Sequence, residues 1–174
     1  MLTDLPPSGA LTCRVAFKEW AACCTALMAG RCDVILRKGG IHERRGEFRP
    51  EHDAFWLMAT RYHQAIGDLA EHVRDLSPAP PPAGTVLLPG FCRVTKTARL
   101  TEERDLDDLR GRHPLSEKTA RMRFHHKTPG LWALTVEVWV ARSPILVADS
   151  PRFGGCRSWV DLPAGVAEAP PAAA

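Results

Sequence analysis

The segment from Leu131 to Val140 constrains the fold more than any other part of the chain. Its apolar residues alternate with other residues at the period of two that is typical of a β-strand with one buried face. We expect this strand to lie at the centre of a sheet. Its apolar face would consist of Leu134, Val136, Val138 and Val140, with Trp139 on the opposite face.

Shorter apolar runs predict further strands, because turn-forming or charged residues bound them. Helical spacing of apolar residues instead predicts helices over 15–28 and 62–76. A third helix is predicted over 101–113, where acidic residues occupy the first turn and basic residues the last. Gly30 is well placed to end the first helix. The predicted strands cover residues 32–36, 54–60, 85–88, 91–98 and 145–148.

The order of these elements favours an α+β fold, because strands and helices do not alternate as they would in a doubly wound α/β protein. At 174 residues the chain has the size of one domain. We expect a single α+β domain over 13–162, with a mixed or mostly antiparallel sheet and about three helices. A proline-rich loop is predicted at 77–84, a flexible N-terminus at 1–12 and a disordered Ala/Pro tail at 163–174.

Composition limits the classes of function. The formal net charge of +3 and the pI near 8.6 fall short of a protein that coats nucleic acid, but they are compatible with anionic ligands. No two of the six cysteines have the two-residue gap of zinc ribbons and redox motifs, so we expect reduced thiols, no metal and no cofactor. The absence of a leader and of a long apolar window favours a cytoplasmic protein without a membrane span.

One segment concentrates polar chemistry. Residues 37–64 hold five Arg, one Lys, three His, four carboxylates and three Gly within 28 residues. Arg37 and Lys38 precede Gly39 and Gly40, so side-chain charge and freed backbone amides can act together on a phosphate. The spacing is not that of a Walker loop. The alternative is a solvated basic turn at the end of a strand.

Two histidines flank the second predicted strand. His52 and His63 could act as acid and base in phosphodiester cleavage, or bind a metal with Glu47 or Glu51. A histidine in such a position is more often a structural hydrogen-bonding residue. Nuclease chemistry of the restriction type also requires an acid followed along a strand by an acid-x-Lys element. The strand that ends at Lys38 lacks this element.

A second basic cluster precedes the strand at 131–140. It consists of His125 and His126 together with Arg121, Arg123 and Lys127. Such a cluster can follow the backbone of a nucleic acid, or it can be no more than an exposed basic loop. We favour the exposed loop.

Three other residues carry weaker signals. Tryptophan within an apolar run usually belongs to the core, which we expect of Trp56 and Trp139. Cys156 has an arginine neighbour but no identifiable histidine or acid partner. We therefore expect Cys156 to be a small buried residue.

Several short motifs, each weak alone, form a specific combination over residues 16–162: Phe17-Lys18-Glu19-Trp20, Leu36-Arg37-Lys38-Gly39-Gly40-Ile41, Glu47-Phe48 with His52, His63-Gln64, Arg123-Phe124 and Gly155-Cys156-Arg157-Ser158-Trp159-Val160. Together they resemble the domain of unknown function 1802 family of uncharacterised bacterial proteins. Met58-Ala59-Thr60 departs from the family pattern, which has a proline before the threonine. The resemblance implies no established activity. Because some relatives look fused to a restriction-endonuclease-like domain, it implies an association with restriction-modification and nucleic acid.

The leading hypothesis is a non-catalytic domain that binds nucleic acid or a phosphate-bearing ligand. The alternatives are a small His-dependent phosphodiesterase or nuclease-like hydrolase, and a regulatory or structural subunit with a protein partner. The sequence leaves open the ligand, the oligomeric state, and whether Arg37, His52 and His63 share one pocket. The predicted ligand-binding residues are Arg37, Lys38, Gly39, Gly40, Arg44, Arg45, His52, Arg61, His63 and Gln64.

Overall fold

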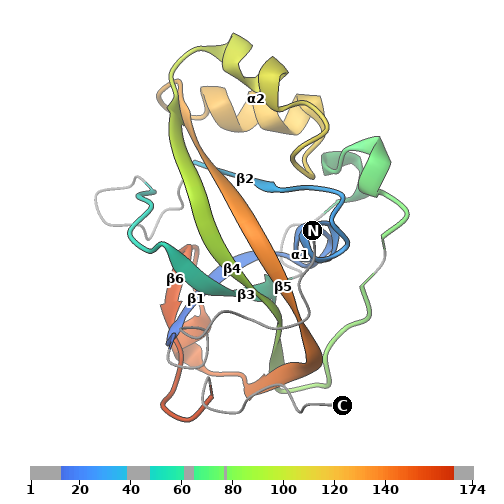
Figure 1. Ribbon diagram of the computed structural model, residues 1–174, viewed down its shortest axis with the longest axis vertical. Helices are drawn as coiled ribbons and strands as arrows, with labels where there is room; N and C mark the ends of the chain where they lie inside the picture. The colour runs from blue at the N-terminus through green and yellow to red at the C-terminus, as the bar shows by residue number, and fades with distance from the viewer. Residues whose placement is uncertain (1–12, 39–47, 61–64, 77, 167–174) are drawn as a thin grey trace.

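The computed structural model describes residues 13–38, 48–60, 65–76 and 78–166 (Figure 1). Within them a six-stranded sheet has the strand order β2-β5-β4-β3-β1-β6. The chain contains, in order, β1 (Val15–Trp20), α1 (Ala21–Met28), β2 (Val34–Arg37), β3 (Ala54–Thr60), the 3-10 helices η3 (Ile66–Asp68) and η4 (Glu71–Val73), β4 (Thr85–Leu100), the 3-10 helix η5 (Glu103–Leu109), α2 (Glu117–His125), β5 (Leu131–Ala148), the 3-10 helix η6 (Pro151–Phe153) and β6 (Trp159–Asp161).

β4 and β5 form a long antiparallel pair that runs the length of the molecule (Figure 1). The segment that joins them contains η5 and α2, and α2 lies beyond the end where β5 begins. The pairing of β4 with β5 extends from Thr85 opposite Ala148 to Leu100 opposite Leu131. β5 also pairs with β2, and β4 with β3, so β5 has a neighbour on each side. The β1–β3 pair is parallel and the others are antiparallel. This confirms the α+β single domain with a mixed, mostly antiparallel sheet.

The sheet is curled, so that its two edges meet. β2 forms one edge and β6 the other. Nevertheless, Arg37 at the end of β2 donates from Nε to Oγ of Ser158, which directly precedes β6, over 2.8 Å. The backbone N–H of Lys18 in β1 donates to the carbonyl of the same serine over 2.8 Å. Residues from β1, β2 and the segment before β6 are therefore brought together.

Two apolar clusters pack on the two faces of the sheet. Alternate residues of β3 point to opposite faces. Phe55 and Leu57 accordingly join one cluster, while Trp56 and Met58 join the other. Burial on both faces explains why this strand reads as a continuous apolar run. The predicted core positions of Trp56 and Trp139 are confirmed, because their exposed fractions are 1% and 8%.

The predicted helix over 15–28 is only half right. Residues 15–20 form β1, which pairs with β3 and β6, and only Ala21–Met28 is helical. Phe17 is fully buried opposite Leu57, so pairing with distant strands outweighs the local helical spacing. Gly30 has φ of 67° just beyond the helix, in the conformation that favours glycine.

The two other predicted helices are also corrected. Residues 101–113 form only the 3-10 helix η5, and within 65–76 only the short η3 and η4 appear. The α-helix in this part of the chain is α2, which takes up Arg121, Arg123 and His125 of the second basic cluster in place of the exposed loop that we favoured. Ser116 caps it by accepting the N–H of Thr119 over 3.3 Å. The buried stripe of α2 consists of Thr119, Ala120 and Phe124, whereas Leu106 alone is buried in η5.

Two further predictions are tested by the described residues. All six cysteines are free thiols. No helix in the described part of the chain is both long and apolar enough to span a bilayer.

Candidate functional site

Arg37 is held in one orientation at the end of β2. Its Nε donates to Ser158, and its Nη1 lies 3.4 Å from Oε2 of Glu19 in β1. Its Cζ lies 5.1 Å from the ring centroid of Phe17, a cation–π distance. Ser158 is fully buried and Glu19 retains only 5% of its exposure. The guanidinium is thus fixed by groups that solvent does not reach.

The carboxylate of Glu19 depends on this arrangement. A buried charge is costly unless it is paired and hydrogen-bonded. Its Oε1 accepts the backbone N–H of Trp20 over 2.8 Å, and its Oε2 faces Arg37. Arg37 therefore contributes to the fold as well as to the charge of the site.

Lys38, the next residue, ties α2 to the start of β5. Its Nζ donates to the carbonyls of Phe124 over 3.2 Å and of Gly130 over 2.7 Å, and also to that of Thr128. These contacts match the three donors of an ammonium group. Carbonyls at the end of a helix carry partial negative charge, which a lysine stabilises. The predicted basic turn is therefore anchored to protein carbonyls at this residue.

Lys18 plays a similar part on the other side. Its Nζ donates to the carbonyls of Phe153 over 2.6 Å and Gly155 over 2.7 Å. Burial lowers the pKa of Lys18, as do the charges of Arg157 and Arg37. The sequence prediction missed this residue because it treated 15–20 as helix. Read as a strand, the segment places Lys18 on the face opposite Phe17 and Glu19.

Two more arginines complete the cationic set. Arg123, in the last turn of α2, has its Cζ 4.6 Å from the ring centroid of Trp20 and donates from Nη1 to the carbonyl of Leu36 over 3.5 Å. Arg157 is exposed on the segment before β6. No hydrogen bond or ion pair joins Arg157 to another residue in the described part of the chain. Its guanidinium is therefore exposed to solvent.

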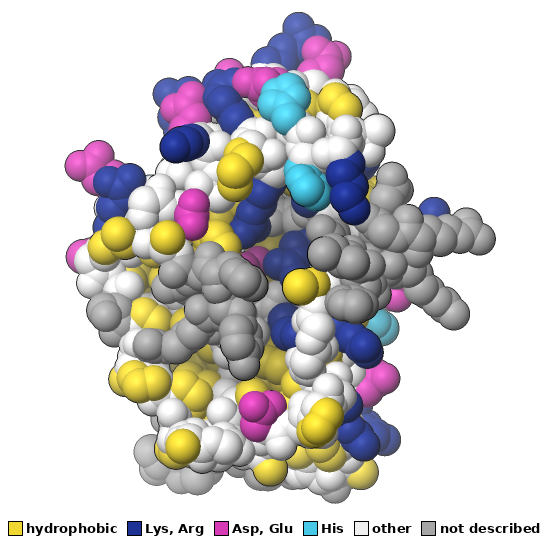
Figure 2. Space-filling view, turned by 180° about the vertical axis from the view of Figure 1, so that it is seen from behind, with side chains coloured by type: hydrophobic (Ala, Val, Ile, Leu, Met, Phe, Trp, Pro, Cys, Tyr) yellow, Lys and Arg dark blue, Asp and Glu magenta, His cyan; other side chains and the backbone are white. Residues whose placement is uncertain are grey.

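These side chains line one pocket of about 990 Å³, which we call the basic pocket. Asp149 is its only carboxylate among the described lining residues. Figure 2 shows Lys and Arg side chains gathered around the middle of one face of the molecule. Cys156 is exposed and also lines the pocket, so the prediction that it is buried is wrong. The cationic lining residues are Lys18, Arg37, Lys38, Arg123 and Arg157, with His126 beside them.

Only part of the predicted site can be placed. Arg37 and Lys38 line the basic pocket. His52 does not; its ring packs edge-on against Trp159 with 5.0 Å between the ring centroids. The other predicted residues lie outside the described residues: Gly39, Gly40, Arg44, Arg45, Arg61, His63 and Gln64.

The second basic cluster is divided by α2. Arg121 is neutralised by Glu103, Asp107 and Glu117, and His125 contacts Glu103. Only Arg123 and His126 reach the basic pocket. In the described ranges, no three His, Cys, Asp or Glu side chains are grouped so as to hold a metal ion.

Comparison with known proteins identifies one family and one fold. The model of a family described as a domain of unknown function (DUF1802) matches residues 16–174, which confirms the resemblance seen in the sequence. The structure of ASCH from Zymomonas mobilis is similar, with a TM-score of 0.53 and 17% identity over 87% of this chain and 89% of that chain. A mutant of that protein gives 0.52 and 17% over 87% and 91%. At this identity the likeness shows a shared fold alone. No curated protein matches the chain.

Proposed function

The chain belongs to the DUF1802 family, and we propose that it binds nucleic acid or another phosphate-bearing ligand in the basic pocket. One observation carries the proposal. Five Lys and Arg side chains line a single pocket that has one carboxylate among its described lining residues. They come from β1, the end of β2 and the residue after it, α2, and the segment before β6. A concave site with one sign of charge concentrates ligands of the opposite sign.

The lysines and the arginines of the basic pocket have different roles. Lys18 and Lys38 direct their donors at backbone carbonyls, so they hold the walls of the pocket in place. The fork of N–H donors of a guanidinium matches the oxygens of a phosphate. Arg157 presents this whole fork, whereas Arg37 and Arg123 already use some of their donors on Ser158, Glu19 and the Leu36 carbonyl. Arg37 is oriented before a ligand arrives, which reduces the entropy lost on binding.

Repulsion between these cations also favours an anionic ligand. The pKa of Lys18 is lowered by burial first and then by the neighbouring Arg157 and Arg37. A phosphate bound among these groups would offset their mutual repulsion.

The binding test uses fluorescein-labelled single-stranded DNA and RNA of twelve nucleotides, measured by anisotropy between 50 and 200 mM salt, conditions over which phosphate contacts weaken affinity. We expect affinity to fall as salt rises. Arg157→Ala should weaken binding roughly 5-fold or more at low salt. The control Arg152→Ala removes an exposed arginine of η6 that does not line the pocket. The proposal fails if DNA, RNA and nucleotides all show no salt-sensitive binding.

A further inference from the structure

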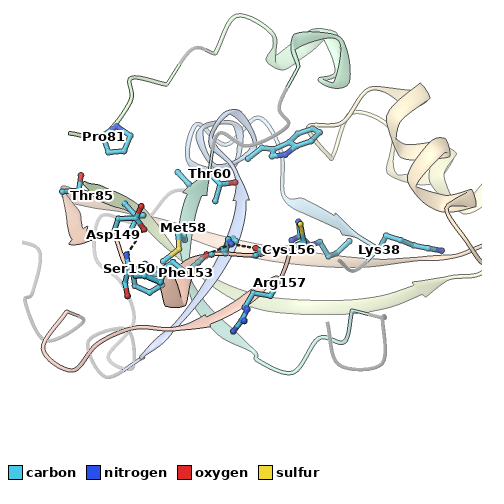
Figure 3. A pocket seen from close by; sticks show the side chains of 18 of the residues that line it. Lys38, Met58, Thr60, Pro81, Thr85, Asp149, Ser150, Phe153, Cys156 and Arg157 are labelled. Carbon is cyan, nitrogen blue, oxygen red and sulfur yellow. Dashed lines mark hydrogen bonds between the residues drawn. The ribbon is translucent and has the colours of Figure 1, made fainter. Parts of the chain in front are cut away.

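The basic pocket has two chemically different ends. In Figure 3, Lys38 and Arg157 lie on one side, Pro81, Thr85 and Asp149 on the other, with Met58 and Phe153 between them. Inorganic phosphate alone would make no favourable contact with these apolar side chains. The apolar part of the lining therefore favours a ligand that carries an apolar group beside its phosphate.

The apolar wall is built from side chains of the second core cluster. Met58 and Phe153 retain 1% and 4% of their exposure, and Val86 of β4 packs against the same cluster. All three line the pocket. Because their packing is fixed by the core, this wall exists before any ligand binds. Binding there removes apolar ligand surface from water at little ordering cost.

The Trp20 ring and the guanidinium of Arg123 stack on each other in the lining of the basic pocket. Trp20 and Arg123 both line the pocket, and the guanidinium carbon lies 4.6 Å from the ring centroid of the indole. Arg123 therefore already covers one face of the Trp20 ring, and this stacking holds its guanidinium beside the pocket for a phosphate. Nucleobases pack readily on aromatic rings, and the apolar wall supplies the ring of Phe153 for this contact.

Asp149 favours one orientation of the ligand in the pocket. It lies at the end of the pocket away from Lys38 and Arg157 (Figure 3). Its carboxylate repels phosphate and can accept N–H groups from the edge of a base. One of its oxygens, Oδ1, already accepts the N–H of Ser150 over 2.8 Å, which fixes the group.

We infer that the basic pocket binds an unpaired nucleotide, with its phosphate at Arg37, Arg123 and Arg157 and its base against Met58, Val86 and Phe153. The inference rests on the proposed function and adds the base. A pocket of about 990 Å³ is far larger than a phosphate requires. A base inside a duplex is stacked and paired and must leave the helix to enter a pocket. The nucleotide is therefore either free or part of a single strand.

The first experiment compares ligands that share a phosphate. Affinities of AMP, CMP, GMP and UMP are measured by calorimetry beside that of ribose 5-phosphate. We expect at least one nucleotide to bind about 10-fold more tightly or better, from the usual contribution of base stacking. Equal affinity for ribose 5-phosphate and all four nucleotides, with salt-sensitive binding retained, would overturn the inference and leave the proposed function standing. Absence of salt-sensitive binding would overturn both.

A variant pair locates the base. Val86→Glu places a charge in the apolar wall and should reduce the preference for nucleotide over ribose 5-phosphate to about 1-fold. Leu146→Glu adds the same charge at an exposed residue of β5 that does not line the pocket, and should keep the preference. An unchanged preference in folded Val86→Glu would overturn the inference.

A last comparison needs no variant and separates the two sources of the nucleotide. Abasic twelve-nucleotide strands should bind at least about 5-fold more weakly than intact strands, and duplexes more weakly still. If intact strands bind far better than mononucleotides, the ligand belongs to a strand; if the two bind alike, it is a free nucleotide. Equal binding of abasic and intact strands would overturn the inference.

Discussion

Replacing Arg37 by alanine should destabilise the fold, because it leaves Glu19 as an unpaired buried charge. Removing one partner of a buried pair typically costs about 3 to 5 kcal/mol. Arg37 retains 19% side-chain exposure and its Nη1 lies 3.4 Å from Glu19 Oε2, a long contact. We therefore expect the lower end of the range, a loss of about 3 kcal/mol in the free energy of unfolding.

Urea unfolding followed by tryptophan fluorescence measures this loss. The control is Arg93→Ala, which breaks a shorter ion pair of 2.6 Å with Glu137, whose two side chains are 52% and 50% exposed. Exposed pairs contribute only about 0 to 1 kcal/mol. Adding Glu19→Gln to Arg37→Ala should restore part of the stability, since the orphaned charge is removed. If Arg37→Ala costs no more than Arg93→Ala, the buried pair does not have the role assigned to it.

Three other predictions concern the supports of the site and the core. Lys38→Met should destabilise the protein by about 2 to 3 kcal/mol and speed amide exchange in residues 124–130, because three carbonyls lose a charged donor; unchanged exchange would contradict the anchoring role. Burial, and after it the charge of His72, lowers the pKa of His113 from 6.5 to about 4. The unfolded chain therefore takes up a proton between pH 6.5 and 4 that the folded chain does not, so the unfolding free energy should fall by up to about 3 kcal/mol as pH drops through that window. His113→Gln should flatten this dependence and the exposed control His126→Gln should not; the same slope in both would refute it. Gly130→Ala should cost about 1 to 3 kcal/mol, since φ is +125° and a Cβ would lie 3.1 Å from the Leu100 carbonyl oxygen. Gly67→Ala, with open space around it, should change stability little, and a similar cost at both positions would argue against strain at Gly130.

The elements that the sequence predicts well are those whose burial pattern is local. β3 was predicted with its observed bounds of Ala54–Thr60, and the alternating segment from Leu131 lies in β5. The sequence does not predict β1, because the apolar spacing of 15–28 fits a helix and only pairing with β3 and β6 makes its first half a strand. The sequence does not predict α2, because only Thr119, Ala120 and Phe124 of its nine residues are buried and charged residues surround them.

The lining of the basic pocket likewise contains residues with a local sequence signal and residues that only the fold brings together. Arg37 and Lys38 line the basic pocket, and the sequence singles them out because basic residues follow an apolar run, a signal contained in a few adjacent residues. Lys18, Arg123 and Arg157 approach them only through the curled sheet and the docking of α2. Lys18, Arg123 and Arg157 are about 20 to 120 residues away from Arg37 in the sequence, and such separations carry no local signal of the meeting.

The most direct test of the central claim is where a nucleic acid binds. Backbone amide resonances are followed while unlabelled single-stranded DNA or RNA is added to isotopically labelled protein. If the ligand binds in the basic pocket, the largest shifts should occur at Lys18, Arg123, Gly155 and Arg157. Shifts should be small around Arg93, an exposed residue of β4 that does not line the pocket. Shifts centred on Arg93, with the pocket resonances unmoved, would contradict the account.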